Sequence, residues 1–281
     1  MSSFSRVVET TPRHIPGFDD LQFVDMDALG ISSSIAVIDD FRVSGLPFSP
    51  HPHAGFAAVT YVFEDSRGAV RSRASTGVDL TIGPGGIVWS EAGRGVVHEE
   101  VPADQGVQLH GLQLFVNLSA SHKTGDPRVL SLRGDEVPEW LGEEGTRVRV
   151  VVGAFQGVPS PLVPIEPFTF LDIHLSSEVS IDLLPENVTA IYVLQGSATA
   201  RLREGQYVDL GSQQAVAVRG GAGALTLNAT SPATQLLLLS CREVSEPVVA
   251  DGPFIMNSRE QVAAAVTRFR SGEMGHLAPL H

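Results

Sequence analysis

Short apolar runs, broken by glycine, proline and polar turns, follow one another along most of the chain. Runs of this length that are rich in β-branched and aromatic residues are typical of strands rather than helices. Many short strands joined by Gly-rich turns indicate an all-β fold built from sandwiches or barrels. We expect strands at 59–63, 86–89, 109–118, 147–152, 168–175, 190–194, 198–202, 214–218 and 235–240.

One segment near the end of the sequence has helical periodicity instead. Ser258 is a candidate N-cap, and Gln261 stands three residues later, as in a capping box. Val262, Val266 and Phe269 fall on one face of a helix at this spacing. We therefore predict a C-terminal helix at about 258–272.

The two halves of the sequence resemble each other. The run that begins at Ala190 aligns without a gap with the run that begins at Val59, which sets Tyr192 against Tyr61, and a Gly-rich turn follows in each half. A repeated unit of this size predicts two barrels in tandem, of the cupin or jelly-roll type.

The polar segment 119–140 reads as the connection between the halves. We accordingly expect an N-terminal domain at 1–135 and a C-terminal domain at 136–281, the latter carrying the helix.

Two pairs of polar residues in the first half have the spacing of metal ligands. His51 and His53 are two positions apart, and so are His98 and Glu100. Residues at i and i+2 of a strand point to the same face, so each pair can converge on one ion. Three imidazoles and one carboxylate form a mixed N/O set that suits divalent iron, and also nickel, copper, manganese or zinc.

The second half has the scaffold without the ligands. At the aligned positions it carries Asp182 and Leu184 in place of the first pair, and Thr226 and Asn228 in place of the second. This pattern predicts one divalent ion per chain, bound in the N-terminal domain. The complete first set argues against a domain that has lost its metal.

Composition narrows the classes of partner. There are 19 Lys and Arg against 32 Asp and Glu, a formal charge of −13. Direct binding to nucleic acid depends on neutralising phosphates, so it is not expected.

Cys241 is the only cysteine and follows an apolar run, which favours a buried, inert thiol over a redox switch. Neither a signal peptide nor an apolar stretch of membrane-spanning length is found, so a soluble, cytoplasmic protein is expected.

Four segments resemble motifs of the pirin family. They are 51–62 (HPHAGFAAVTYV), 82–100 (IGPGGIVWSEAGRGVVHEE), 110–118 (HGLQLFVNL) and 252–257 (GPFIMN), the last with its following helix. Pirins are two-cupin proteins with an iron site in the N-terminal barrel. The resemblance implies that His51, His53, His98 and Glu100 are the metal ligands, the four residues that strand spacing also selects.

The sequence departs from the family pattern at two positions. Ala57 stands where pirins usually have a glutamate, a residue that other cupins use as a ligand or proton acceptor, and this puts proton-transfer chemistry in doubt. Glu91 stands where a threonine is common. It could return a carboxylate to the pocket, or it could be a solvated loop residue.

Some pirins resemble quercetin 2,3-dioxygenases, which cleave flavonols with dioxygen and release carbon monoxide. The resemblance thus implies an oxidoreductase with a small aromatic substrate such as a flavonol. Glu100 is the candidate proton acceptor. Candidate apolar pocket walls are Phe56, Trp89, Val97 and Phe115, although core packing is the favoured role for any single one of them.

A second hypothesis is a regulatory protein that reports the redox state of its iron to a protein partner without turnover. Some pirins resemble transcription co-regulators of this kind, and Ala57 mildly favours this alternative. His110 is either a residue that orients a metal ligand or a structural histidine.

Overall fold

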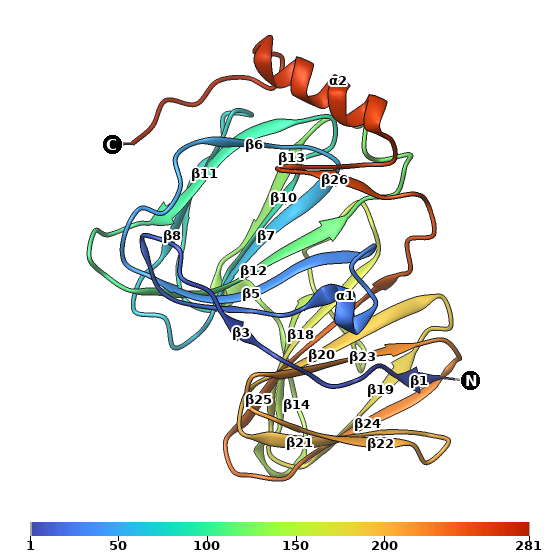
Figure 1. Cartoon of the computed structure of the whole chain (residues 1–281). Coiled ribbons are helices and arrows are strands. Elements are labelled where there is room, and N and C mark those ends of the chain that lie inside the picture. Colours follow the sequence, from blue (N-terminus) through green and yellow to red (C-terminus); the bar gives the residue numbers. More distant parts are fainter. Residues whose placement is uncertain (1, 281) are drawn as a thin grey trace.

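The structure is a computed structural model that describes residues 2–280, and it contains two β-barrels stacked on each other (Figure 1). Each barrel consists of a large sheet facing a four-stranded sheet. The large N-terminal sheet has the order β13 (Arg128–Leu132), β10 (Ile87–Glu91), β7 (Phe56–Val62), β12 (Leu109–Asn117), β5 (Ile35–Val43), β4 (Phe18–Phe23) and β3 (Thr11–Pro12). The small one has the order β6 (His51–His53), β11 (Val96–Pro102), β8 (Val70–Ala74) and β9 (Asp79–Ile82).

The C-terminal barrel repeats this plan. Its large sheet has the order β1 (Ser3–Phe4), β23 (Gln214–Arg219), β20 (Asn187–Gln195), β25 (Thr234–Arg242), β18 (Phe168–Leu175), β15 (Arg147–Val152) and β14 (Glu139–Leu141), with β2 (Val8–Glu9) also paired to β23. Its small sheet has the order β19 (Glu178–Leu183), β24 (Gly223–Ala229), β21 (Ser197–Leu202) and β22 (Tyr207–Gly211). The prediction of two tandem all-β barrels is confirmed.

The remaining elements are short. They are the hairpin strands β16 (Ala154–Phe155) and β17 (Val158–Pro159), the hairpin strands β26 (Val249–Asp251) and β27 (Phe254–Met256), two 3-10 turns (Gly134–Glu136 and Glu143–Gly145), and the helices α1 (Met26–Leu29) and α2 (Arg259–Arg270). Within the described residues, no helix is long and apolar enough to cross a membrane.

Each predicted strand is present, and β15 and β18 have the predicted bounds. The segment 119–140 is more ordered than expected, because it contains β13, which pairs with β10, and the start of β14, which pairs with β15. Both strands lie at the edge of a sheet, and most of their side chains are exposed or half-buried, so no apolar run marks them in the sequence. The chain passes from one large sheet to the other between β13 and β14.

The predicted helix is present with Ser258 as its N-cap, since the side chain accepts a hydrogen bond from the Gln261 N–H. The predicted apolar face is only partly right. Val262 and Ala265 are buried, whereas Phe269 is 40% exposed. Phe269 lies in the last turn of the helix, beyond the buried contacts that α2 makes with the barrel.

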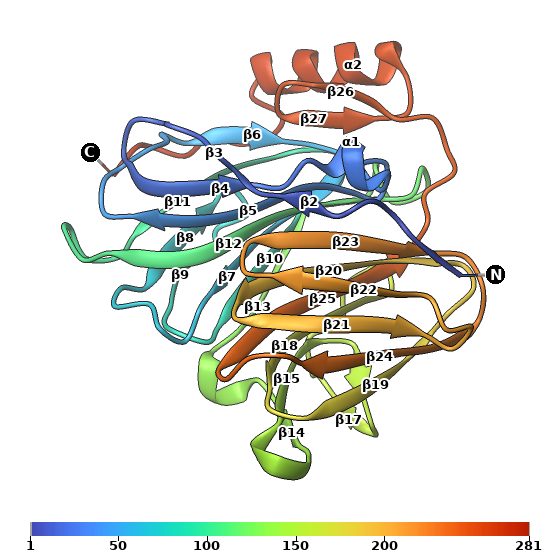
Figure 2. The same cartoon turned by 60° about the horizontal axis from the view of Figure 1, so that its bottom comes forward.

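The two ends of the chain cross over between the barrels. Strands β1 and β2 extend the C-terminal sheet through β23, although they precede the N-terminal barrel in sequence. Conversely, β26, β27 and α2 lie over the N-terminal barrel (Figure 2), where Phe254 forms a parallel bridge with Ala54. The final segment of the chain therefore covers the strand that carries His51 and His53.

The two large sheets pack face to face and share one apolar core. Tyr61 and Tyr192 occupy equivalent places in it, directly opposite Leu112 and Leu237 in their own sheets. Each tyrosine donates a hydrogen bond across the interface, Tyr61 to Asp172 (2.8 Å) and Tyr192 to Asp40 (3.1 Å). The aligned tyrosines thus mark a pseudo-twofold pair of contacts that locks the barrels together.

Cys241 is buried beside this core, and burial raises the pKa of its thiol to about 12. A thiol that stays protonated at neutral pH is a poor nucleophile. The expectation of a buried cysteine is confirmed.

Candidate metal centre

Local strand pairing brings the three predicted histidine ligands together. Strand β6 runs antiparallel to β11, with His51 directly opposite His98. His53 lies two residues further along β6 and so points to the same side as His51. The pleat thus directs three imidazoles into the N-terminal barrel from two adjacent strands.

The three rings form a compact group. Their centroids lie 4.8 Å (His51–His53), 4.7 Å (His51–His98) and 4.6 Å (His53–His98) apart. The Nε2 atoms of His51 and His98 are 3.2 Å apart, and one nitrogen of each of the three rings falls in a group with mutual separations within 4.8 Å. Imidazole nitrogens that share one ion at about 2.0–2.1 Å lie roughly 3 Å apart, so this spacing fits a single ion.

The protonation state also suits a metal ion. Burial lowers the pKa of His51, lowers that of His53 to about 3 with further help from neighbouring His51, and lowers that of His98 well below its usual value. Neutral imidazoles are the form that binds metal. The Nδ1 of His51 lies 2.9 Å from the Ser49 carbonyl, which it reaches by donating its proton, and its Nε2 lone pair then remains free for an ion.

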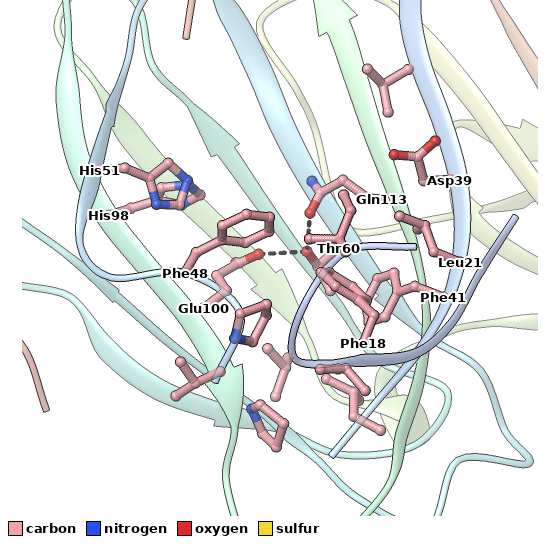
Figure 3. A pocket seen from close by; sticks show the side chains of 18 of the residues that line it. Phe18, Leu21, Asp39, Phe41, Phe48, His51, Thr60, His98, Glu100 and Gln113 are labelled. Carbon is pink, nitrogen blue, oxygen red and sulfur yellow. Dashed lines mark hydrogen bonds between the residues drawn. The ribbon is translucent and has the colours of Figure 1, made fainter. Parts of the chain in front are cut away.

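Glu100 lies beside this group but not within it. Its two carboxylate oxygens accept hydrogen bonds from Thr60 Oγ1 (2.5 Å) and Ser72 Oγ (2.9 Å). Figure 3 shows the carboxylate directed toward Thr60, while His51 and His98 lie together on one side of the pocket. Burial raises the pKa of Glu100, and these two hydrogen bonds oppose the rise. Its predicted role as a fourth ligand remains a prediction.

A cavity of about 310 Å³ extends from the histidines into the N-terminal barrel. Glu100, Thr60, Gln113 and Asp39 contribute its polar groups. Its walls are otherwise mainly apolar and include Ile15, Phe18, Leu21, Val37, Phe41, Val43, Phe48, Val70, Leu109 and Phe115. Apolar cavities with a few convergent polar groups are typical of small-molecule binding sites.

The four predicted wall residues have different locations. Phe115 lines the cavity, and Phe56 packs behind it, with ring centroids 4.5 Å apart. Trp89 faces the opposite side of its sheet and packs edge-to-face against Phe168 in the interdomain core, so its prediction as a wall is wrong. Val97 is also wrong, because it alternates with His98 along β11 and so packs outward against α2 and its neighbours.

The departures from the pirin pattern now have a structural explanation. Ala57 faces the core between the barrels, so a carboxylate at this position would point away from the histidines. Glu91, directly opposite Ala57, is buried, ion-paired with Arg128, and accepts a hydrogen bond from the Ile165 N–H (2.7 Å). Glu91 is therefore neither a carboxylate of the pocket nor a solvated loop residue. It connects β10 to the segment that enters the second barrel.

Lys123 is a further buried residue close to the histidines that the sequence did not indicate. Lys123 is fully buried, and its Nζ donates hydrogen bonds to the carbonyls of Gly55 (2.6 Å) and Ile255 (2.7 Å) and to the side chain of Asn117. These acceptors come from the turn after His53, the end of β12 and β27. Lys123 lies in a polar segment, so the sequence gives no signal that it is buried.

Two further histidine groups have structural roles. His110 lies between Asp65 (2.6 Å) and Asp40 (3.1 Å) at the interdomain contact and is not part of the group formed by His51, His53 and His98. Among the described residues, Glu64, Asp172 and His174 also cluster closely enough to hold an ion. Arginines at 147 and 149 surround this second group and neutralise it, which disfavours a cation.

The alignment of the second barrel needs a correction in one strand. In the N-terminal barrel His51 lies opposite His98, so the equivalent of His51 is the residue opposite Thr226. That residue is Ser180 and not Asp182, which lies opposite Ala224. Asp182 is exposed, and Asn228 pairs with Glu178 at the end of the sheet. The expected single site in the N-terminal barrel remains a prediction.

Comparison with known proteins gives matches along most of the chain. Residues 8–116 match the model of the pirin family, and residues 170–275 match that of the pirin C-terminal cupin domain. A Pseudomonas aeruginosa protein named "Putative quercetin 2,3-dioxygenase" is 33% identical over 79% of this chain and 77% of its own length.

Two solved structures share the fold. Quercetin 2,3-dioxygenase from Acinetobacter baumannii superimposes with a TM-score of 0.86 at 24% identity, covering 99% of this chain and all (100%) of that one. A bacterial pirin from Escherichia coli in complex with nickel(II) gives a TM-score of 0.66 at 19% identity, covering 87% of this chain and 100% of the other. The family models, the tandem barrels and the three converging histidines lead to one conclusion: this chain belongs to the pirin family of two-cupin proteins.

Proposed function

We propose that this pirin is a metal-dependent dioxygenase that opens the heterocycle of flavonol-like substrates and releases carbon monoxide. The observation that carries the proposal is an apolar cavity of about 310 Å³ that ends at three neutral, converging imidazoles. The similarity to proteins named as quercetin 2,3-dioxygenases supports it.

His51, His53 and His98 would hold one divalent ion, and iron(II) is the metal that we propose. Nickel, copper, manganese and zinc also suit this donor set, and a related pirin from Escherichia coli has been solved in complex with nickel(II). When bound, the ion would act as a Lewis acid that stabilises the deprotonated flavonol hydroxyl.

Glu100 is the proposed proton acceptor. It lines the same cavity as the histidines, and burial makes its carboxylate more basic than usual. Thr60 and Ser72 donate hydrogen bonds to its two oxygens and so fix its orientation. A carboxylate held in this way can take the hydroxyl proton of the substrate without help from position 57.

The apolar walls have two effects on the substrate. Phe18, Phe41, Phe48 and Phe115 provide faces against which an aromatic ligand can stack. They also keep water from the reacting carbon atoms, which strengthens the electrostatic interactions inside the cavity.

The experiment is oxygen uptake by protein loaded anaerobically with each metal in turn, together with the loss of flavonol absorbance and the release of carbon monoxide. Turnover in the wild type and its loss in His98→Ala support the proposal. Absence of turnover with iron, nickel, copper and manganese would refute it.

Glu100→Gln separates the two predicted roles of this residue. If Glu100 is only the base, the variant keeps its metal and loses about 10²–10⁴ in turnover rate. If Glu100 is a ligand, the metal affinity itself falls.

The alternative function is a redox-dependent regulator. Its support in the sequence was Ala57, which does not face the site. A partner pull-down with the ferrous and ferric forms would test that alternative.

A further inference from the structure

A row of three polar side chains crosses the inner face of the large N-terminal sheet. Asp39 on β5 lies directly opposite Gln113 on β12, and Gln113 lies directly opposite Thr60 on β7. All three line the cavity. In Figure 3, Asp39 lies on the far side of the pocket from His51 and His98, with Gln113 and Thr60 between them.

The second barrel provides an internal comparison for this row. Because Tyr61 and Tyr192 occupy equivalent places, the register assigns equivalents to the three polar residues in the C-terminal sheet. The equivalents of Asp39, Gln113 and Thr60 are Leu171, Leu238 and Ile191.

Those three residues are fully buried and belong to the apolar core of their barrel. The scaffold therefore accepts hydrophobic side chains at all three places. Polar groups facing an apolar interior cost stability unless they are paired, so their presence in the N-terminal barrel points to a binding function rather than to a role in folding.

Two members of the row have partners within the protein. Thr60 donates to Glu100, and Gln113 donates through Nε2 to the Val59 carbonyl (2.9 Å) while its Oε1 lies 3.3 Å from Thr60 Oγ1. Asp39 differs, because its Oδ1 is buried and has no hydrogen-bond partner in the described part of the chain.

The surroundings of Asp39 further disfavour a charged carboxylate that lacks a hydrogen-bond partner. Burial raises the pKa of its carboxyl to about 6, and the positive charge of Arg13 only partly opposes the rise. Its neighbours in the cavity wall include the apolar residues Val37, Phe41 and Leu21. A buried acceptor without a partner gains free energy from any ligand that supplies a donor.

We propose that Asp39 is a specificity-determining residue, which accepts a hydrogen bond from a hydroxyl group at the end of the substrate remote from the metal. This inference rests on the proposed function and refines its substrate class. The preferred ligand is a flat aromatic molecule with one hydroxyl at the histidine end and a second at the opposite end.

The test compares two flavonols under anaerobic conditions, so that binding is measured without turnover. Quercetin carries hydroxyls on all its rings, whereas 3-hydroxyflavone carries only the hydroxyl at the metal-binding end. Dissociation constants come from ligand absorbance or fluorescence. The proteins are wild type, Asp39→Leu, which installs the residue of the second barrel, and the surface control Asp79→Asn.

Wild type and Asp79→Asn should bind quercetin at least about tenfold more tightly than 3-hydroxyflavone, which is the value of a hydrogen bond to a charged acceptor. Asp39→Leu should lose that preference while keeping its affinity for 3-hydroxyflavone. Its melting temperature should equal or exceed that of wild type, because a buried carboxylate oxygen without a hydrogen-bond partner has been removed. A structural role for Asp39 would instead lower the melting temperature and the affinity for both ligands.

An unchanged quercetin preference in Asp39→Leu would overturn the inference about Asp39 while leaving the proposed dioxygenase intact. A preference that disappears in Asp39→Leu would support Asp39 even if no flavonol were turned over. Failure of both flavonols to bind the metal-loaded protein would overturn both proposals.

Discussion

Acidification of the metal-free protein should destabilise it through the buried histidines, and His53 allows the size of the effect to be calculated. Its pKa falls from 6.5 to about 3 on folding, because burial and neighbouring His51 disfavour the charged ring. Between these two values the unfolded chain binds a proton that the native protein does not. The free energy of unfolding therefore decreases as the pH drops below 6.5, and the decrease ends near pH 3.

At about pH 5, His53 alone should lower the free energy of unfolding by about 2 kcal/mol relative to neutral pH, and the full loss is about 5 kcal/mol. His51 and His98 act in the same direction, because burial lowers the pKa of both. The assay is urea denaturation of metal-free protein at about pH 7.5 and pH 5, with the difference taken between wild type and His53→Gln.

The variant should lose about 2 kcal/mol of the wild-type pH dependence, since glutamine does not titrate. His276→Gln, at an exposed position on the C-terminal tail, is the matched control and should behave as wild type. If His53→Gln and wild type show the same pH dependence, then His53 is not buried as a neutral ring and the reasoning about this site fails.

Three further perturbations test the structure around the site. Lys123→Met leaves three acceptors without their donor and should lower the free energy of unfolding by about 3–5 kcal/mol in urea denaturation. An unchanged denaturation midpoint would disprove the buried contacts. Tyr192→Phe removes the donor to buried Asp40 and should lower the free energy of unfolding by about 1–3 kcal/mol in the same assay. An unchanged free energy of unfolding would contradict this contact. Ala57→Glu places a carboxylate in the interdomain core, so calorimetry should show a markedly lower melting temperature, and a rise in flavonol turnover would contradict the assigned orientation of this residue.

The fold could be predicted from the sequence to the extent that apolar runs fill a core. Strands such as β15 and β18 are buried on both faces, and their nearly continuous apolar runs gave the right bounds. The edge strand β13 has intermediate and exposed positions along most of its length, so its sequence does not differ from that of a loop. The crossing of the two chain ends could not be predicted, because it depends on contacts between residues about 200 positions apart, such as Phe4 and Val218.

The candidate site, like the fold, was predictable from the sequence only in part. The two ligand pairs are local patterns, since the spacing within one strand places both side chains on one face. The pocket walls are not local. Trp89 is aromatic and close to the second motif in sequence, but the side of the sheet it faces depends on which residues of β7 lie opposite it. Asp39 escaped notice because an acidic residue in an apolar strand gives no sign of which barrel face it occupies until the register is known.

Metal stoichiometry tests the central claim most directly. Purified protein is dialysed anaerobically against iron(II), and bound metal is measured per chain by mass spectrometry for wild type, His276→Gln and His98→Ala. Convergence of the three imidazoles predicts one ion per chain in the first two proteins and none in His98→Ala, which should remain folded by circular dichroism. A folded His98→Ala protein that still binds one ion would contradict the claim.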